Sequence, residues 1–579
     1  MRKKYWRQRF LRTTISFLFS IAFFAASAQT SYITGTVTDA QTNETLPGVT
    51  IIVDGTTLGA NTDHEGNFKI NLKSGVYSLT VSYISYKTIN RSNVTIEPEK
   101  ETKIDFRLNP ADLSLKEVEV MGKVNRESEN MLLLEQRQAL VATQAVGARE
   151  MSRKGAGNAE AAVTKVSGIS KQEGVKNVFV RGLGDRYNST TLNGFPVPSE
   201  DPEYKNIALE FFGTDVIQSI DISKVFSSSN YGDVGGAVIN INSKELVGDK
   251  ALSIEGELGT NTAGFGGDFL TLDGGGGYLG FTKGSTLPKP ETGSKYIDNY
   301  DFKNSLDPKS LNMGVNHSYG IAGGRIFFTG ENKNPLSFFL VASYDSKYSY
   351  TEEIVRNSGS TNENVDIDLK GKRYSKNVSQ LVLGNINWDL NRKHRILYNF
   401  MLVHANSQFL GDYAGLNINM DNDGREVFLR RQQVNDNILT VNQLISSWNL
   451  SERIKFDAGA SYNSVKGSEP DRRINVLVNN GGGKYQYVLG NEQKRFFSVL
   501  DESDFNVKTS FSYKLPDNLG KNNSQLQIGY SGRFLTDNFE ASDYDSNPVS
   551  GYFDVGNLKM DEHYNQENLK SGAFWVEYG

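Results

Sequence analysis

The chain has 579 residues, too many for one ordinary hydrophobic core, so several domains are expected. Hydrophobic residues make up 38% and the mean hydropathy is -0.45, which excludes a bundle of transmembrane helices, whereas 56 glycines and 11% aromatic residues favour β-structure. The sequence contains no cysteine, which excludes disulfides and cysteine-ligated metal sites, and its net charge of -5 argues against a nucleic-acid partner.

Residues 1–28 are predicted to be a secretory signal peptide. Six basic residues precede an apolar run over residues 15–26, and Ala26, Ser27 and Ala28 supply the small-residue cleavage site. A membrane anchor is the alternative, but the run is shorter than the roughly 20 apolar residues that span a bilayer. No later stretch is apolar for long enough to cross as a helix, so a membrane crossing would have to use strands.

Residues 30–109 are predicted to form a small β-sandwich, because short runs of alternating apolar and polar residues are separated by turn residues. His64 stands between Asp63 and Glu65, but since no second histidine lies nearby, a solvated turn is favoured over a metal loop. The expected strands are 33–38, 48–53, 67–72, 76–83, 94–96 and 102–108.

Four strings mark this segment: Gly35-Thr-Val-Thr-Asp39, Leu46-Pro-Gly-Val-Thr-Ile51, Thr62-Asp-His-Glu-Gly-Asn-Phe68 and Gly75-Val-Tyr-Ser-Leu-Thr-Val-Ser-Tyr83. They closely resemble the carboxypeptidase regulatory-like domain, a transthyretin-type sandwich that precedes the plug in many TonB-dependent receptors. The resemblance implies a docking or stabilising role for this domain.

Residues 110–135 are interpreted as a linker that contains one short strand. Its alternating valines and carboxylates lie in an extended segment, and a free strand edge can be captured by another protein through main-chain hydrogen bonds. The segment resembles a TonB box, which implies the periplasmic domain of TonB as partner. The alternative is a last edge strand of the sandwich. The residues concerned are Leu115, Glu117, Val118, Glu119 and Val120.

Residues 136–246 are predicted to form an α+β domain. Residues 158–166 have a capping residue and an alanine-rich body, which predicts a short helix. Four motifs then follow in an order that resembles the plug domain of TonB-dependent receptors: an Arg-Gly strand, an Asn-Gly turn, an apolar strand that ends in lysine, and a Gly-Gly-Ala-Val-Ile strand. The motif residues are Arg181, Gly182, Asn193, Gly194, Lys224, Gly235 and Gly236.

Two features of this domain have competing interpretations. Gly182 and Gly184 follow an apolar strand, but a dinucleotide-binding turn needs a third glycine and an immediate helix, and neither is present. The resemblance implies that Arg181 is held by carboxylates of the barrel wall in an ionic lock between plug and barrel. The alternative for Arg181 is a surface arginine at a strand end.

Residues 247–579 are predicted to form part of an antiparallel transmembrane β-barrel, because one face of each strand suits lipid and the other a wet lumen. Short links are expected at 331–334, 391–394 and 451–453, and long polar loops at 348–376, 466–504 and 536–570. The segment has room for about 12 to 14 strands, fewer than the roughly 22 of such transporters. The chain is therefore expected to be truncated within the barrel.

Aromatic residues in the expected loops could stack on a ligand, but packing or interfacial positions are favoured for them. Residues 226–234 also differ from the plug ending usual in glycan importers, which puts a glycan substrate in doubt. The aromatic residues are Tyr348, Tyr350, Tyr485, Tyr487 and Tyr544.

Taken together, the resemblances imply a mainly β protein of the outer membrane that imports a nutrient ligand, a ferric siderophore or another large substrate such as an oligosaccharide, by TonB-dependent active transport. The implied partners are TonB with its inner-membrane proton-motive complex, outer-membrane lipid, an extracellular ligand and, as an open option, a surface lipoprotein that captures the ligand. No cofactor, metal site or catalytic motif is expected. The alternatives are a passive barrel channel or adhesin, and an enzyme that carries a regulatory-like sandwich.

Overall fold

The structure is a computed structural model of the whole chain. It forms two compact units, Met1–Met121 and Gly122–Gly579, and each is treated by itself. The described residues are 31–579 except 41, 57, 85, 99, 110–126, 128, 140, 173–174, 262–267, 285–286, 313, 358–364, 422, 482–483, 489–491, 516–523, 550–551 and 555–557.

The first unit contains the predicted β-sandwich. One sheet has the order β4-β1-β7 with β8 also on β1, and the other has the order β3-β2-β5-β6. Their inward side chains, Ile33, Val37, Ile51 and Leu79 among them, form one closed core with almost no exposed surface. The strands are β1 (Ser31–Asp39), β2 (Thr50–Val53), β3 (Gly59–Asn61), β4 (Asn67–Leu72), β5 (Gly75–Ser82), β6 (Ile89–Ile96), β7 (Glu101–Lys103) and β8 (Phe106–Leu108).

Two details of the sandwich differ from the prediction. The segment 102–108 is two strands, β7 and β8, which both pair with β1 in parallel, because the chain crosses β1 at Ile104. The backbone N–H of Ile104 donates to the carbonyl of Thr34 at 2.8 Å, and a Cβ added to Gly35 would overlap the Ile104 carbonyl oxygen. The short strand β3 has no apolar alternation and was not predicted.

The second unit begins with the predicted α+β domain, called here the plug segment (residues 136–246). Its main sheet has the order β13-β12-β15-β14-β9, and helix α4 is capped by the side chain of Asn158, as predicted. Helix α2 lies across the boundary between the predicted linker and plug and was not predicted. The elements are α2 (Glu129–Gln138), β9 (Thr143–Gly147), α3 (Ala148–Arg153), α4 (Ala159–Val163), β10 (Ile169–Ser170), β11 (Phe179–Val180), η1 (Asp185–Tyr187), β12 (Ser189–Leu192), β13 (Phe195–Pro196), η2 (Leu209–Phe211), β14 (Ile217–Ser223) and β15 (Val238–Ser243).

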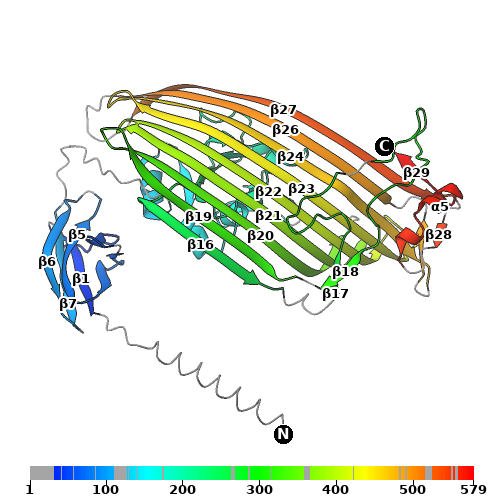
Figure 1. Cartoon of the computed structure of the whole chain (residues 1–579), viewed down its shortest axis with the longest axis horizontal. Coiled ribbons are helices and arrows are strands. Elements are labelled where there is room, and N and C mark those ends of the chain that lie inside the picture. The colour runs from blue at the N-terminus through cyan, green and yellow to red at the C-terminus, as the bar shows by residue number, and fades with distance from the viewer. Residues whose placement is uncertain are drawn as a thin grey trace, which may run out of the picture. The chain divides into compact units, whose positions relative to one another are not determined.

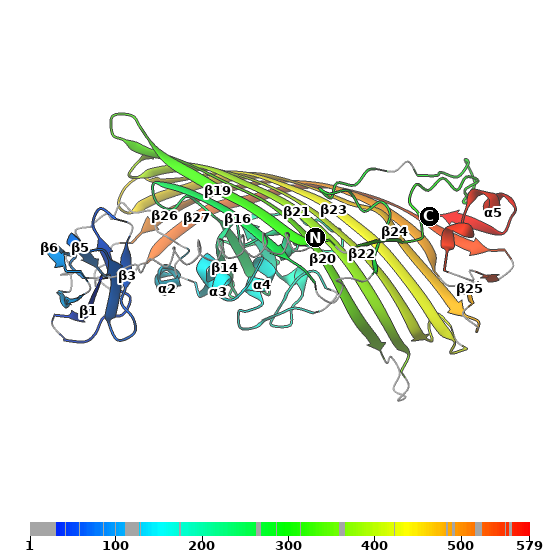
Figure 2. The same ribbon diagram turned by 60° about the horizontal axis from the view of Figure 1, so that its bottom comes forward.

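The rest of the unit is dominated by one large antiparallel sheet, which curves over the plug segment (Figures 1 and 2). Its order is β16-β19-β20-β21-β22-β23-β24-β26-β27-β29, with β25 and β28 attached beside β24. The strands are β16 (Lys250–Gly259), β19 (Asn316–Thr329), β20 (Asn334–Asn357), β21 (Ile367–Asn391), β22 (His394–Asn417), β23 (Glu426–Asn449), β24 (Ile454–Asn479), β25 (Tyr485–Val488), β26 (Gln493–Lys514), β27 (Gln525–Pro548), β28 (Tyr552–Asp554) and β29 (Phe574–Tyr578).

The two faces of this sheet differ: the face under the plug segment buries polar and apolar side chains together, and the opposite face exposes large apolar side chains. We call the face that carries the plug segment the inner face. Alternate residues point to opposite faces of a strand, and on the inner face the polar side chains are buried: Asn385, Asn387, Asn399, Gln443, Ser461, Asn463, Asp504 and Asn506. On the outer face large apolar side chains are exposed: Phe338, Leu340, Ile386, Trp388, Tyr398, Leu444, Tyr462, Phe505 and Phe511.

The three short links are confirmed, but two of the three long loops, 348–376 and 466–504, are wrong over most of their length, and the third is wrong over residues 536–548. β20 and β21 remain paired out to Asn357 and Ile367, so most of residues 348–376 is strand, and the same holds for residues 466–504 and 536–548. We call these parts of the strands the distal strand segments. Their polar residues suggested loops. Other parts of the chain or water cover both faces of these segments, so neither face requires apolar side chains.

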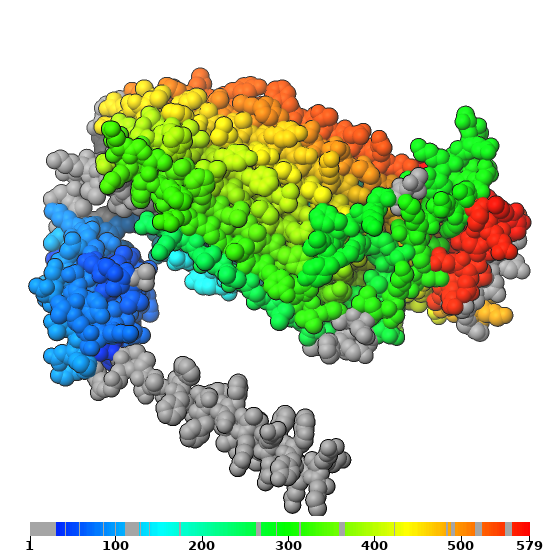
Figure 3. Space-filling model, viewed as in Figure 1, coloured from blue at the N-terminus to red at the C-terminus, as the bar shows by residue number. Residues whose placement is uncertain are grey.

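A further segment, between β16 and β19, packs on the outer face of the distal strands. It contains β17 (Asp268–Thr271) and β18 (Lys309–Asn312), which pair with each other. Phe281 stacks on His404 with ring centroids 4.0 Å apart, and His404 lies an odd number of positions from the inward Asn399 on the same strand. Figure 3 shows the segment between β16 and β19, in green, lying over strands coloured yellow. The remaining short elements are η3 (Met560–Glu562) and α5 (Gln566–Lys570).

Within the described residues, no helix combines the length and the apolar character that crossing a membrane requires.

Replacing Gly35 with alanine should destabilise the sandwich by about 1–3 kcal/mol, because the new methyl group would collide with backbone. Gly75→Ala is the matched control, since a Cβ there meets only the movable ring of Tyr77. Hydrogen exchange of residues 31–108 in the full chain measures both. Equal protection in the two variants would contradict the account of this crossing.

Candidate functional site

The centre of the plug segment's contact with the sheet is the predicted Asn-Gly turn. Asn193 and Gly194 have φ values of 51° and 82° and connect β12 to β13 as a two-residue hairpin loop, a geometry that asparagine and glycine adopt most readily. The side chain of Asn193 accepts a hydrogen bond from the backbone N–H of Ser243 at 3.0 Å and donates to Gln443 of the sheet at 2.9 Å. The turn therefore joins two plug strands and the large sheet, which is called the wall below.

Inner-face polar side chains hold the backbone around this turn. Gln443 donates to the carbonyl of Leu192 at 2.9 Å, Asn463 to that of Pro196 at 3.0 Å, and Lys508 to that of Gly194 at 2.8 Å. Each such bond contributes only about 1 kcal/mol net, but a buried partner left unpaired costs about 1–3 kcal/mol. The wall and the plug segment thus satisfy each other's buried polar groups.

One ion pair links the plug segment to the wall. Arg395 of β22 contacts Glu245, just after β15, at 2.5 Å, and its Nε also donates to Asn387 at 2.7 Å. The two side chains are 39% and 19% exposed, so the pair is partly screened and contributes at most about 1 kcal/mol. Its effect is mainly to fix the position of β15 against β21 and β22.

Arg181, the residue expected in the ionic lock, has no carboxylate partner in the part of the chain that the structure describes. It occupies a tight turn with Gly182, at φ values of 52° and 81°, in which Val180 and Leu183 exchange backbone hydrogen bonds. This turn directs its guanidinium to the carbonyl of Lys224, 3.3 Å away within the plug segment. Among the described residues Arg181 forms no ion pair with the wall, and the ion pair found between plug and wall is that of Glu245 with Arg395. The lock of Arg181 stays a prediction.

Lys224 ends β14 beside this turn. Its ammonium donates to the carbonyl of Ser167 and, at 2.6 Å, to the side chain of Gln144. Burial and, second, the neighbouring charge of Arg181 lower the pKa of Lys224. The predicted lysine thus ties β9, β14 and the loop after α4 together inside the plug segment.

Gly235 and Gly236 lead into β15 where the chain passes under Asn188. Both backbone N–H groups donate to the carbonyl of Tyr187, and a Cβ on Gly236 would overlap the Asn188 side-chain oxygen. Asn188 is 4% exposed and also donates to the carbonyls of Val178, Leu183 and Gly184. Sequence reasoning missed Asn188, because a lone asparagine gives no signal that it bridges four chain segments.

A buried charged group lies where the plug segment meets the middle of β24, beside Gly467. Lys176 contacts Asp201 at 2.8 Å and Glu200 at 3.5 Å. Burial raises the pKa of Glu200, whereas burial alone would lower that of Lys176, which the two carboxylates instead raise. No motif in the sequence predicts this cluster, because Lys176 is more than twenty positions from both carboxylates.

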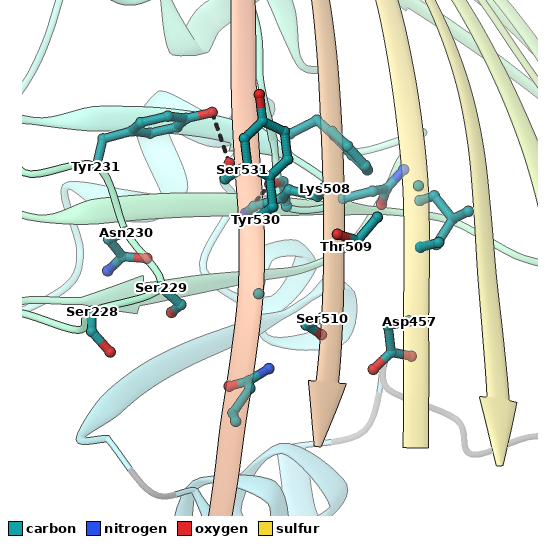
Figure 4. A pocket seen from close by; sticks show the side chains of 18 of the residues that line it. Ser228, Ser229, Asn230, Tyr231, Asp457, Lys508, Thr509, Ser510, Tyr530 and Ser531 are labelled. Carbon is teal, nitrogen blue, oxygen red and sulfur yellow. Dashed lines mark hydrogen bonds between the residues drawn. The ribbon is translucent and has the colours of Figure 1, made fainter. Parts of the chain in front are cut away.

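A cavity of about 640 Å³ separates the plug segment from strands β23 to β27. Its lining includes Lys508, Asp457 and the plug residues 228–232, and Ser531 donates to the Tyr231 hydroxyl across it at 3.3 Å (Figure 4). The plug segment is therefore bonded closely to β21, β22 and β23 and more loosely to β26 and β27.

The other predicted site residues are partly outside the described residues. The signal peptide and the strand with Leu115, Glu117, Val118, Glu119 and Val120 fall there. His64 is exposed in its turn, and the described residues contain no group of three or more side chains placed to hold a metal ion. The five tyrosines predicted in loops lie in strands. Tyr348, Tyr350, Tyr485 and Tyr544 pack on other aromatic rings, and Tyr487 is buried in an apolar cluster.

Replacing Arg395 with glutamine should loosen the plug segment, because it removes the ion pair with Glu245, at a cost of about 1 kcal/mol. Hydrogen exchange of β15 in the full chain is the measurement, with faster exchange expected. Arg181→Gln is the control and should leave β15 unchanged. The reverse ranking would support the lock predicted from the sequence.

Comparison with known proteins places two domains in the chain. Residues 33–120 match the model of the CarboxypepD_reg-like domain, and residues 135–238 match that of the TonB-dependent Receptor Plug Domain. The first match includes residues 115–120, so the strand interpreted as a TonB box lies within its range.

Individual proteins are also similar. TonB-dependent receptor P3 of Formosa agariphila is 33% identical over 95 residues, 16% of this chain and 9% of that receptor, so the match spans about a tenth of its length. The ferric-catecholate import receptor Fiu of E. coli K12 has 13% identity and a TM-score of 0.34, covering 71% of this chain and 66% of Fiu. The siderophore receptor PiuA of Acinetobacter baumannii has 11% identity and a TM-score of 0.28, covering 71% and 65%. The chain therefore contains a CarboxypepD_reg-like domain followed by a TonB-dependent receptor plug domain.

Proposed function

We propose that this protein imports a nutrient ligand across the outer membrane and that the large sheet is wall of a transmembrane β-barrel. The observation that carries the proposal is the outer face of the sheet, where large apolar side chains are exposed although the inner face already buries its side chains against the plug. Hydrocarbon is the solvent that such an outer face suits, and strands can cross it only when their backbone groups are paired.

The proposed ligand is a ferric siderophore or another large substrate such as an oligosaccharide. The plug segment lies on the inner face and is bonded to it, so the proposed passage needs the plug to move. TonB, driven by the inner-membrane proton gradient, is the proposed source of that movement. A passive channel or adhesin is the alternative, and it would not need the hydrogen-bonded plug.

The outer apolar band supports contact with lipid. Leu444 of β23 is 53% exposed there, next to the inward Gln443. Leu444→Lys should destabilise the protein in lipid vesicles by about 2–4 kcal/mol if the position is near the bilayer midplane. Leu450→Lys, in the short link after β23, is the matched control and should cost much less. Equal urea midpoints for the two variants would argue against a membrane-spanning wall.

The segment 117–120 is proposed as the site where TonB adds a strand. Val118→Pro removes a backbone donor and should abolish uptake while ligand binding at the cell surface is retained. Val118→Thr keeps the donor and should import normally. If the proline variant imports as well as the wild type, residues 117–120 are not the TonB box, and their place in the sandwich domain's matched range becomes the better interpretation.

The direct test of the function is growth and uptake with the full-length gene deleted, on a panel of ferric siderophores and oligosaccharides as sole iron or carbon source. Loss on one class, and an equal loss when TonB is deleted, is the expected result. Uptake that depends on this protein but survives the loss of TonB would favour the passive channel.

A further inference from the structure

The inner face continues beyond the plug segment and carries three arginines there. Arg373 lies on β21 and is an even number of positions from the inward Asn385, and Arg431 has the same relation to Gln443 on β23. Residues an even number apart on a regular strand share a face. These two side chains therefore point to the same side of the sheet as the plug.

A β-bulge brings the third arginine to this face. The pairing of β24 with β26 shifts between Glu469 and Arg472, where β24 has one extra residue. The shift places Arg472 beside the inward Glu469, and its guanidinium is 3.2 Å from that carboxylate. Without the bulge, Arg472 would share the face of Tyr462, which is outward.

Two phenylalanine rings hold the guanidinium groups flat. Arg373 and Arg431 lie over the ring of Phe409, with centroid distances of 4.6 and 5.6 Å, and Arg472 lies over Phe496 at 4.2 Å. When a guanidinium lies over an aromatic ring, the N–H groups at its edge remain free to donate hydrogen bonds in the guanidinium plane. The rings thus orient several donors without using any of them.

Some hydrogen-bond donors of these arginines have no partner among the described residues. The Nε atoms of Arg431 and Arg472 are buried and have no hydrogen-bond partner among the described residues. Arg431 donates to Gln433 at 2.8 Å, and no carboxylate of the described chain forms an ion pair with it. Arg373 is 3.9 Å from Glu353, which is too long for a hydrogen bond. The three arginines therefore face two carboxylates, those of Glu353 and Glu469. Several of their N–H groups remain able to donate to a ligand.

The group remains accessible from the plug side. The side chains of Arg373 and Arg472 are 41% and 27% exposed. Glu469 lies within electrostatic reach of Lys176 and Asp201 of the plug segment, so the cluster sits near the charged end of the plug. A molecule bound to the arginines would also be next to the part of the plug that must move.

We propose that Arg373, Arg431 and Arg472, stacked on Phe409 and Phe496, bind an oxyanion group of the imported ligand, a carboxylate or a phosphate. The proposal rests on the proposed function, and it adds the chemical class of ligand. The fork of a guanidinium matches the two oxygens of such a group, and charge-assisted bonds of this kind are about twice as strong as neutral ones. A neutral ligand would leave the excess cation and the buried Nε atoms unpaired.

Binding of two probes, citrate and inorganic pyrophosphate, to the full chain in lipid nanodiscs tests the proposal by calorimetry. Binding of at least one probe is expected below about 10 mM, where a Kd of about 1 mM is easily measured. Arg431→Gln should weaken it about ten-fold or more, and Arg431→Lys should weaken it less, because lysine keeps the charge but loses the fork. A preference for citrate would indicate a carboxylate ligand, and one for pyrophosphate a phosphate.

Arg356→Gln is the matched control, because it removes one positive charge from the exposed pair with Asp368 on the outer face. It should leave the Kd unchanged. Thermal unfolding of each variant shows whether the fold is intact, and Phe409→Leu, which keeps every charge, should still weaken binding by loosening two guanidinium groups.

Absence of binding by both probes, or an equal effect of Arg356→Gln and Arg431→Gln, overturns the proposal. TonB-dependent uptake measured in the same strain separates the two claims. Uptake without anion binding leaves the proposed function in place and removes the oxyanion site. Anion binding without TonB-dependent uptake does the opposite.

Discussion

The structure depends on the burial of polar side chains on the inner face of the large sheet. Asn399, Gln443 and Asn463 are almost completely buried and would each be costly without a partner. The plug segment supplies those partners: the backbone carbonyls of Leu192 and Pro196 accept from Gln443 and Asn463, and the Ser243 hydroxyl donates to Asn399. Because the outer face is apolar, the sheet cannot instead bury itself as an ordinary sandwich would. Wall and plug therefore require each other.

The contact between plug and wall combines hydrogen bonds with apolar packing. Each hydrogen bond is worth little net, since water can replace either partner once the plug leaves. Leu383, Met401 and Val441 of the inner face also pack in one apolar core with the plug segment, so displacing the plug would expose apolar surface as well. The uneven distribution matters too: bonds concentrate on β21 to β23, while the cavity beside β26 and β27 leaves that side loosely held. Arg373 and Arg431 lie beyond the plug on β21 and β23, and Arg472 lies on the neighbouring β24.

Much of this could be predicted from the sequence where a local pattern determines the structure. The Asn193-Gly194 turn, the short helix capped by Asn158, the sandwich strands and the short links between wall strands all follow from residue type and spacing. The alternation of the wall strands also predicted which face is polar. What could not be predicted depended on distant partners. Arg181 was expected to contact the wall, whereas the ion pair found between plug and wall is that of Glu245 with Arg395, 150 positions apart. The distal strands were taken for loops, because polar residues on both faces give no signal when other segments or water cover them. The bulge that presents Arg472 is equally invisible in the sequence.

The central claim is that the plug must leave this hydrogen-bonded wall for the ligand to pass. Because the chain has no native cysteine, a single disulfide can lock the two parts. Ser243 and Asn399 are buried at the plug and wall contact, with side-chain oxygens 3.3 Å apart, and Ser243→Cys with Asn399→Cys should form a bond across it. The measurement is ligand uptake by cells that carry the double variant, with the bond followed by electrophoretic mobility and with Ser243→Cys alone as control. The account predicts that the oxidised double variant binds ligand but does not import it, and that reduction restores import. Import at the wild-type rate with the bond intact would show that the plug does not have to leave the wall at this contact.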